Sequence, residues 1–533
     1  MILLVDGLAA ALAVVVAALA PLAAAAVDGR DRDGARAPLV VAARRLMRPA
    51  GALAAIALWL PAGVGAALLT LPYAIACALF GLHGLGRLAA RGGRVPAELA
   101  TAAGLVLWPG GALWLLAHRA GVELLGYPPL WVGLTAAHFH VAGAFLPIIV
   151  GRAVVGRGRR AGAVAIVAVL AVPLTAAGIA GPRWLEQAAA LTMAAAGLGS
   201  ALVLLTTRGA LARLAGAALV ATMLLAAQYA SRGWIAPLRL GDLDALTTML
   251  VAHGALNLLG VALPGLLATA RAGALPGHDR PPLSRVRGRA HVGPRFFDDQ
   301  QVGAPRGLVD DLAALGHAGL AAAAVAPPIR AFYQRTADHE LVVRPTWRRG
   351  FRAGARLWQR VGRRLGQLDL PTDAERGDEG ITSRIVGLDP ARDGRRDPRA
   401  WIRQYADGRA MYVAAYATHA HADRAYMNIA FPLPGGSMTS VLRMDHLGAG
   451  VRVSTRVGGD AGIYYVARLG RWTAPIRLPL SEVIDVWTAD DPAAPADLRA
   501  ATPAGFTTIA RHRVWLCGVR FVTLDYAMRP RRG

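Results

Sequence analysis

The first half of the chain is a succession of apolar blocks, each close to the length needed to cross a lipid bilayer. The hydrocarbon core is about 30 Å thick, so a spanning helix needs about 20 mainly apolar residues. Residues 1–270 supply such blocks in series, whereas 271–533 carry an ordinary share of charged residues. The second and third blocks meet at Leu71-Pro72, so 49–90 is also compatible with one broken hairpin. The blocks predict about nine spans, at 2–27, 49–69, 71–90, 98–118, 130–151, 161–181, 185–207, 210–230 and 244–269.

The arginines in the connections between these spans predict the orientation of the chain. Short loops rich in Arg stay on the cytoplasmic side of a membrane. Connection two holds no arginine and connections four and six hold one each, Arg119 and Arg183, whereas connections one, three and five are rich in it. The arginines of these three connections are Arg30, Arg32, Arg36, Arg44, Arg45, Arg48, Arg87, Arg91, Arg94, Arg152, Arg157, Arg159 and Arg160. We therefore expect a multi-pass protein of the plasma membrane, with its N-terminus outside and its C-terminal half in the cytoplasm.

The formal net charge of +24 comes from a chain without lysine, so all 58 basic residues are arginines. That bias, together with abundant Ala and Gly, is typical of GC-rich codon usage. A strongly basic chain ordinarily suggests a polyanionic partner, but a compositional origin of the charge leads us to expect no nucleic acid. The two cysteines, Cys77 and Cys517, lie in different halves of the chain, which excludes a disulfide framework and a zinc site with paired cysteines.

Polar side chains interrupt two of the apolar spans. His138 and His140 lie in the fifth predicted span, and His253 and Asn257 lie on one helical face of the ninth. Ionisable groups inside a bilayer are costly and usually face the protein interior or a functional pathway. With a rise of about 1.5 Å per residue, His138 and His253 both lie about 12–14 Å inside the membrane, and His140 points about 200° away from His138. We therefore expect a polar site between two helices, the alternative being histidines that simply bond to neighbouring backbone.

The segments around these residues resemble a known family. Ala-His-Phe-His-Val-Ala-Gly at 137–143 and His-Gly-x-x-Asn-x-x-Gly at 253–260 are similar to the YndJ-like family of bacterial multi-span membrane proteins. Members of that family pair a multi-span N-terminal half with a soluble C-terminal half, and they are often described as transporter-like without an assigned substrate. The resemblance implies the same architecture here. Val141 departs from the family pattern, which leads us to expect an aromatic residue at that position.

The polar half of the chain predicts a linker and a folded domain. Residues 271–330 are rich in Gly, Pro, Ala and Arg and predict the linker, and 331–533 form the domain. From residue 400 onward, alternating strands predict an α+β fold with a mainly antiparallel sheet, which is compatible with curvature around an apolar pocket. The last strand of this sheet is expected to run over 513–526.

A basic amphipathic helix is expected over about 347–368. Its apolar side carries Trp358 and Val361, and no acidic residue lies on the arginine-rich remainder. Such a helix near a cytoplasmic leaflet fits anionic lipid headgroups, the alternative being a solvated face over a small core. Its arginines are Arg348, Arg349, Arg352, Arg356, Arg360, Arg363 and Arg364.

The remaining motifs favour a protein that is not an enzyme and predict no cofactor. His419 and His421 alternate on a strand as in a metal loop, but no third ligand stands at a telling spacing. The sequence holds no Walker loop, nucleophile elbow or His-Glu-x-x-His motif. The first interpretation is a transporter-like membrane protein that binds a small solute or shuttles protons at the histidines. The alternatives are a metal- or haem-binding redox protein, since His-Phe-His also resembles a haem-ligating segment of haem–copper oxidases, and a non-catalytic lipid-sensing envelope protein.

Overall fold

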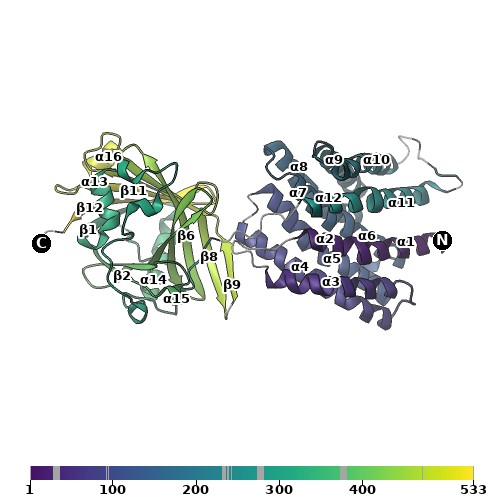
Figure 1. Ribbon diagram of the computed structural model, residues 1–533, viewed down its shortest axis with the longest axis horizontal. Helices are drawn as coiled ribbons and strands as arrows, with labels where there is room; N and C mark the ends of the chain where they lie inside the picture. The colour runs from purple at the N-terminus through teal and green to yellow at the C-terminus, as the bar shows by residue number, and fades with distance from the viewer. Residues whose placement is uncertain are drawn as a thin grey trace. The chain divides into compact units, whose positions relative to one another are not determined.

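The computed structural model describes residues 2–531 apart from 28–36, 92, 94, 231–235, 237–238, 242, 273–280, 373–380 and 471. The chain divides into two compact units, Met1–Asp279 and Arg280–Gly533 (Figure 1). The first unit is helical, and the second is built around a β-sheet with few helices. Of the arginines that predict orientation, Arg30, Arg32, Arg36 and Arg94 lie outside the described residues.

The described part of the first unit is a bundle of nine long helical segments, in agreement with about nine predicted spans. Eight of the nine are long and apolar enough to cross a membrane, which confirms a multi-span helical half. The segments are α1–η1–α2 (Ile2–Val14, Val15–Leu19, Ala20–Ala26), α3 (Pro38–Ala57), α4 (Val64–Arg91), α5 (Pro96–Ala120), α6–η3–α7 (Pro129–His138, Phe139–Phe145, Leu146–Ala153), α8 (Arg159–Ala180), α9 (Arg183–Leu205), α10 (Ala210–Ala230) and α11–η4–α12 (Ala245–Ala255, Leu256–Ala262, Leu263–Arg271).

The boundary between the second and third segments differs from the expected one. α4 continues without a break through Pro72, and the chain turns instead between Ala57 and Val64. A proline is tolerated inside a membrane helix because neighbouring helices and local adjustments satisfy the carbonyl that it frees. The turn contains Gly63, whose φ of +152° is a conformation that favours glycine. The expected boundary at Leu71-Pro72 is therefore wrong.

α3 is not among the eight segments that are long and apolar enough to span a membrane, and it carries three arginines. It runs antiparallel to the first segment. Near its start, Arg44 donates to the Ala25 carbonyl over 3.0 Å. Further along, Gly51 packs so closely on the first segment that a Cβ there would lie 2.2 Å from the Val16 oxygen. α3 therefore packs alongside the first segment as a further long helix of the bundle.

Arginines of the first and fifth connections cap the C-terminal ends of neighbouring segments. The last carbonyls of a helix lack intrahelical donors and carry a partial negative charge, which favours cations. Arg44 bonds the Ala25 carbonyl at the end of α2, and Arg152 bonds the Ala272 carbonyl beyond α12. Arg157 caps α9 with hydrogen bonds to the Val203 and Thr206 carbonyls of 3.0 and 3.1 Å. These arginines thus fasten helix ends.

The described part of the second unit holds a twelve-stranded antiparallel sheet, which confirms the expected α+β class. Hydrogen-bonded neighbours follow the order β1-β12-β11-β10-β7-β6-β5-β4-β3-β2, and the β8–β9 hairpin branches from β6. The elements are β1 His339–Trp347, β2 Thr382–Gly387, β3 Arg399–Gln404, β4 Ala410–His421, β5 Arg424–Leu433, β6 Gly436–Leu447, β7 Gly450–Ser454, β8 Gly462–Leu469, β9 Trp472–Arg477, β10 Leu480–Thr488, β11 Thr508–Leu516 and β12 Val519–Pro530, with helices α13 Pro327–Gln334, α14 Arg352–Leu365, α15 Pro390–Asp393 and α16 Ala496–Ala500.

The sheet closes on itself as a barrel. The Ile381 N–H, just before β2, donates to the Leu341 carbonyl of β1 over 3.0 Å, so the two ends of the strand order meet. Successive side chains on a strand alternate between the interior and the exterior. The inward side chains form one apolar cluster that includes residues from β1, β5, β6 and β12. Ile329, Phe332 and Tyr333 of α13 belong to the same cluster, so this short helix fills one end of the barrel.

The final strand prediction is corrected by the structure. Residues 513–526 belong to two strands, β11 and β12, that pair antiparallel. The turn between them contains Cys517 and Gly518, with φ values of +49° and +81°. Two consecutive residues with positive φ are typical of the tight turns that match the twist of a hairpin. The apolar residues on both sides of this turn hide it in the sequence.

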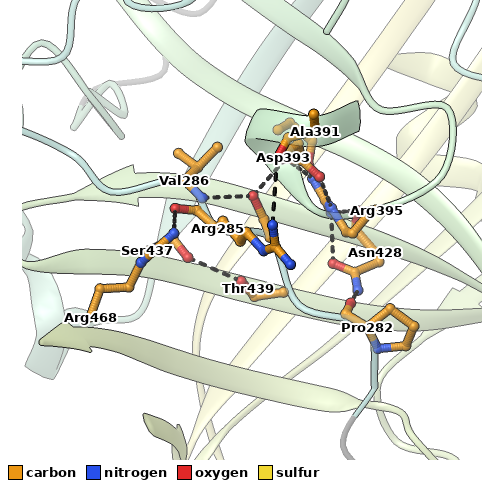
Figure 2. Close-up of polar contacts among 12 residues, drawn as sticks. Pro282, Arg285, Val286, Ala391, Asp393, Arg395, Asn428, Ser437, Thr439 and Arg468 are labelled. Atoms are coloured by element: carbon orange, nitrogen blue, oxygen red, sulfur yellow. Dashed lines mark hydrogen bonds and ion pairs between the residues drawn. The ribbon is translucent and has the colours of Figure 1, made fainter. Parts of the chain in front are cut away.

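The expected linker over 271–330 is largely part of the barrel unit, whose boundary lies at residue 280, and 273–280 lie outside the described residues. A buried polar network fastens this segment to the sheet (Figure 2). Asp393 accepts from the Ser284 hydroxyl and from Arg395 Nε, both over 2.6 Å. Arg395 Nη1 also donates to Asn428 Oδ1 of β5 over 2.8 Å, and the Asn428 amide donates to the Pro282 carbonyl. Residues 282–297 are therefore an outer layer of the barrel, whereas apolar residues within 308–329 contribute to the interior cluster, despite the Gly- and Pro-rich composition of the segment.

Candidate functional site

Three membrane segments within the described residues contain a π-helical turn in mid-span. The turns are η1, η3 and η4, and each is followed two positions later by a proline, namely Pro21, Pro147 and Pro264. A proline lacks an N–H and clashes with the carbonyl four residues earlier, and a π-helical turn is one adjustment that relieves both. Such turns are rare and often mark functional sites. The histidine segments of the sequence therefore coincide with irregular backbone.

The three segments that carry these turns contact one another. α1 contacts both α6 and α11, and η3 contacts η4 directly. The fifth and ninth predicted spans, which hold the four polar residues, are thus neighbours. A site shared between them is geometrically possible because their irregular turns lie together.

Thr222 of α10 joins the two polar residues of the ninth predicted span. The Asn257 amide donates to the Thr222 hydroxyl and to the His253 carbonyl, both over 2.8 Å. The Thr222 hydroxyl also lies 2.8 Å from His253 Nδ1, and the Thr222 carbonyl lies 3.2 Å from the same atom. When Nδ1 carries no proton it can accept from the Thr222 hydroxyl, and when it carries the proton it can donate to the Thr222 carbonyl. Both tautomers of His253 have a partner on one residue.

His138 lies directly before η3, the turn that contacts η4 of the segment that carries His253. It is the last residue of α6, and a charge on His253 interacts with its ring electrostatically. The Nε2 atom of His138 is buried and makes no hydrogen bond to any residue that the structure describes. A buried nitrogen of this kind is available to a solute, a water molecule or a proton. His138 and His253 thus supply ring nitrogens to one region of the bundle.

His140 faces a different set of neighbours. Its ring stacks on Tyr73 of α4 with centroids 5.7 Å apart, and its Nδ1 lies 2.7 Å from the Ala136 carbonyl. It also fills the space beside Gly111 of α5, where a Cβ would lie 2.7 Å from Nδ1. Its Nε2 is buried without a hydrogen bond among the described residues. The structure therefore brings His138, His253 and Asn257 toward one region and places His140 against α4 and α5.

Two hairpins of the bundle nevertheless repeat one arrangement. His140 and Asn257 are each the second residue of a π-helical turn, and each side chain bonds the carbonyl four residues before it. Each turn has a glycine three positions further on, Gly143 or Gly260, and each is followed directly by Leu-Pro. The side chain that makes the bond thus occupies the same place in both turns.

The helices that precede the two turns show matching contacts. Gly111 of α5 receives the His140 ring, and Thr222 of α10, which lies 111 positions later, bonds Asn257. One turn earlier on the same helices, Leu107 and Ala218 lie beside Gly143 and Gly260 at the same offset of 111. The connection after α10 is six residues longer than the one after α5, which accounts for the offset of 117 between the turns themselves. α5–α7 and α10–α12 are therefore structurally equivalent hairpins.

Sequence reasoning missed Thr222, Gly111 and Tyr73. Thr222 resembles several other threonines in apolar helices, such as Thr175, whose hydroxyl bonds only its own helix. A signal was present in the shared spacing of His140 and Asn257 to a glycine and to a Leu-Pro pair. That spacing shows that His140 and Asn257 occupy equivalent positions in two hairpins. Their neighbours Gly111 and Thr222 are identified only by the contacts in the structure.

The predicted metal loop of the soluble half is a hydrogen-bonded triad. His419 Nε2 and His421 Nδ1 lie 3.0 and 3.1 Å from the two carboxylate oxygens of Asp460, and the His419 ring stacks on Tyr426. In the part of the chain that the structure describes, no group of three or more His, Cys, Asp or Glu side chains is placed to hold a metal ion. Asp460 therefore binds the two rings directly.

The basic helix is α14, and its exposed surface differs from the expected one. Only Ala355 and Gly362 are buried, whereas Leu357, Trp358 and Val361 are exposed to 63%, 38% and 38%. Trp358 and Val361 were expected to face the domain core. Small residues allow the helix to lie close to the barrel unit, so its larger apolar side chains remain at the surface beside the arginines.

These features define a polytopic membrane protein whose described residues form a helical half of nine long segments and a β-barrel half. The family profile described as YndJ-like protein matches residues 8–261. The "Uncharacterized membrane protein YndJ" of Bacillus subtilis (strain 168) is 30% identical over 443 residues, which cover 80% of this chain and 77% of that protein. The chain therefore belongs to the YndJ-like family. No solved structure matches it.

Proposed function

We propose that the membrane half is a transporter-like protein with a proton-relay site formed by His138, His253 and Asn257. The observation that carries the proposal is the pair of Thr222 partners of His253 Nδ1, a hydroxyl that can donate to it and a carbonyl that can accept from it. Because the hydroxyl serves one tautomer and the carbonyl serves the other, the proton on His253 can change nitrogen without losing a partner. Asn257 holds the hydroxyl in place, and His138 offers a second ring nitrogen nearby.

The matched hairpins support the same proposal. Many transporters are built from repeats, with the site near the middle of the membrane at discontinuous helices. Here α5–α7 and α10–α12 present equivalent turns, and η3 and η4 touch. The two repeats differ at the site itself, since Gly111 faces the His140 ring where Thr222 faces Asn257. The second repeat therefore supplies His253 and Asn257 to the relay, and the first repeat supplies His138. His140 packs the first repeat against α4 and α5.

We also propose that the protein lies in the plasma membrane with its N-terminus outside and its barrel in the cytoplasm. An odd number of passes puts the two ends of the helical half on opposite sides, and α3 supplies the ninth. Arg44, Arg152 and Arg157 cap helices at the end of the bundle that the positive-inside rule assigns to the cytoplasm.

Proton flux in liposomes tests the relay. Full-length protein is reconstituted with a pH-sensitive dye inside the vesicles, and the rate of dye response is measured after an external pH jump. We expect H138A and H253A each to lower the protein-dependent rate at least ten-fold, because each removes a ring nitrogen from the path.

The matched control is H118Q. His118 Nδ1 bonds the Pro129 carbonyl over 3.1 Å at the end of its helix, outside the site, so this variant is expected to retain the wild-type rate. Wild-type flux in both H138A and H253A would exclude the assigned site. The absence of protein-dependent flux in the wild type would exclude protons as the transported species.

We infer a second role for α14, which is contact with anionic lipid. Seven arginines lie on this helix and on the residues just before it, and no acidic residue lies within 347–368. Arg363 pairs with Asp369, just beyond the helix, over 3.7 Å. Exposed Leu357, Trp358 and Val361 lie beside those charges. An amphipathic helix with an apolar face and a basic face binds at the headgroup layer. The exposed apolar side chains favour this over a purely solvated surface.

A fluorophore on L357C reports this contact in the full chain, in a C517S background. The protein is placed in nanodiscs of phosphatidylcholine with or without phosphatidylglycerol. We expect the emission to shift to the blue only when the anionic lipid is present, whereas a label on D423C, where the side chain is 79% exposed, does not respond. Equal emission from L357C in the two lipid mixtures would exclude an anionic-lipid contact.

A further inference from the structure

Arg403 is a buried cation inside the barrel. The strand registers place it opposite Tyr412 of β4 and Ser383 of β2, and Trp401 precedes it by two positions on the same inward face. It is 6% exposed, and its guanidinium carbon lies 4.1 Å from the Trp401 ring centroid and 4.3 Å from that of Tyr412. The two aromatic rings hold the guanidinium in place through cation–π contacts.

The hydrogen bonds of this guanidinium are incomplete. Its Nη2 lies 3.5 Å from the Tyr416 hydroxyl, a long contact, and its Nε is buried without a hydrogen bond to any described residue. No carboxylate among the described residues lies within 4.0 Å of Arg403. Buried cations are normally paired, because removal from water is costly without a counter-charge. Within the part of the chain that the structure describes, the guanidinium therefore has no negatively charged partner.

A second charged group of the interior, on β10, is already engaged. Glu482 of β10 is 8% exposed, and its Oε2 accepts from His512 Nε2 over 2.7 Å. Burial raises the pKa of Glu482, but the hydrogen bond and charge of His512 outweigh it and hold the pKa below its usual range. Glu482 is therefore an anion paired with His512 and does not neutralise Arg403.

Three tyrosines complete the polar part of the interior. Burial raises the pKa values of Tyr412 and Tyr416, and it raises that of Tyr526 to about 12. All three hydroxyls are therefore protonated at neutral pH and can donate hydrogen bonds. A guanidinium flanked by phenol donors is suited to an oxyanion, to which a planar fork of N–H groups donates in pairs.

Arg403 lies between α13 and a group of apolar interior side chains. Those apolar side chains remain partly exposed to solvent. Toward α13, Trp401 and Tyr416 are buried. Away from α13, a set of apolar side chains packs against the same cluster yet remains partly exposed, and it includes Trp347, Phe431, Met438, Ile484, Val514 and Phe521. Phe521 also contacts Phe351 at the start of α14, with ring centroids 5.7 Å apart. An apolar lining thus leads from α14 to a buried cation.

We propose that the barrel binds an amphipathic molecule with an oxyanion head and an apolar chain, and that Arg403 is the residue that binds the head. The chain would lie along the partly exposed apolar side chains, and the tyrosine hydroxyls would donate to the head. A fatty-acid carboxylate and a lysophospholipid phosphate share this chemistry. The proposal is independent of the proton relay, since it concerns only the soluble unit.

Equilibrium binding to the full-length protein in detergent tests the proposal. The probes are radiolabelled oleate, oleoyl lysophosphatidate and the uncharged oleyl alcohol, each corrected for partition into protein-free micelles. We expect saturable binding of at least one anionic probe, at least ten-fold tighter than that of the alcohol. The anionic probe with the higher affinity identifies a carboxylate or a phosphate as the head. We expect R403Q to weaken the anionic probe at least ten-fold.

Two further variants keep the test decisive. R520Q removes an exposed arginine of β12 and is expected to bind like the wild type. Y416F removes only the hydroxyl next to Arg403 and is expected to weaken binding several-fold with little change in packing. The anionic probe should raise the Tm of the wild type and of R520Q but not that of R403Q. No saturable anionic binding, or equal affinities in R403Q and R520Q, would overturn the proposal.

Discussion

Replacement of Thr222 by valine removes one hydroxyl while nearly preserving the shape of the side chain. Thr222 is fully buried, and its hydroxyl makes hydrogen bonds of 2.8 Å to His253 Nδ1 and to the Asn257 amide across two helices. Hydrogen bonds between membrane helices contribute about 0.6 kcal/mol on average and at most about 1.7 kcal/mol. Two such bonds give an expected loss of about 1–3 kcal/mol in the free energy of unfolding for T222V.

Reversible unfolding in mixed micelles with a rising fraction of SDS measures this loss. The matched control is T175V, because the Thr175 hydroxyl bonds only the Ala171 carbonyl of its own helix over 2.8 Å. We expect the control to change the free energy of unfolding by less than about 0.5 kcal/mol. If T222V and T175V are equally stable, Thr222 does not join α10 to the ninth predicted span, and the reasoning on tautomers loses its basis.

Two further predictions concern packing and pH. G111A should lower the free energy of unfolding of the bundle by about 1–3 kcal/mol, because its Cβ would lie 2.7 Å from His140 Nδ1. The control G254A should leave it unchanged, because a Cβ at that position meets no atom within 4 Å. Unfolding in SDS compares the two variants. In the barrel, burial holds the pKa of His339 below its ordinary value of 6.5, although the Arg335 carbonyl bond opposes it. The unfolded chain therefore binds the proton first, and stability is full above about pH 6.5 and falls as the pH drops toward the folded pKa. Thermal unfolding between pH 5 and 7.5 should show this loss in the wild type and a smaller one in H339Q.

The sequence allowed the membrane half to be predicted because length and hydropathy constrain a spanning helix strongly. A matching depth of His138 and His253 could also be predicted, since it depends only on position along a span, and it stays a prediction. The π-helical turns were not accessible. Pro72, Pro109 and Pro173 lie inside uninterrupted α-helices, so a proline alone does not indicate a π-helical turn.

In the soluble half, local patterns predicted strands but not the path of the chain around them. Closure of the barrel depends on Leu341 meeting Ile381, a pairing that no local signal encodes. The segment that was expected to be a linker carries Val286, Val292 and Phe297, which pack on the outer face of the sheet. The linker was predicted from the Gly- and Pro-rich composition of this segment, and these few apolar residues were too sparse to indicate that it packs on a sheet. Arg403 was missed because its burial follows only from the closed register.

A double-mutant cycle of proton flux tests the central account most directly. Wild type, H138A, H253A and the double variant are reconstituted in parallel, and the initial rates after one pH jump are compared. If the two histidines belong to one relay, loss of either interrupts it, so the double variant should be no slower than the slower single variant. Losses that multiply, or wild-type flux in either single variant, would contradict a shared site between the fifth and ninth spans.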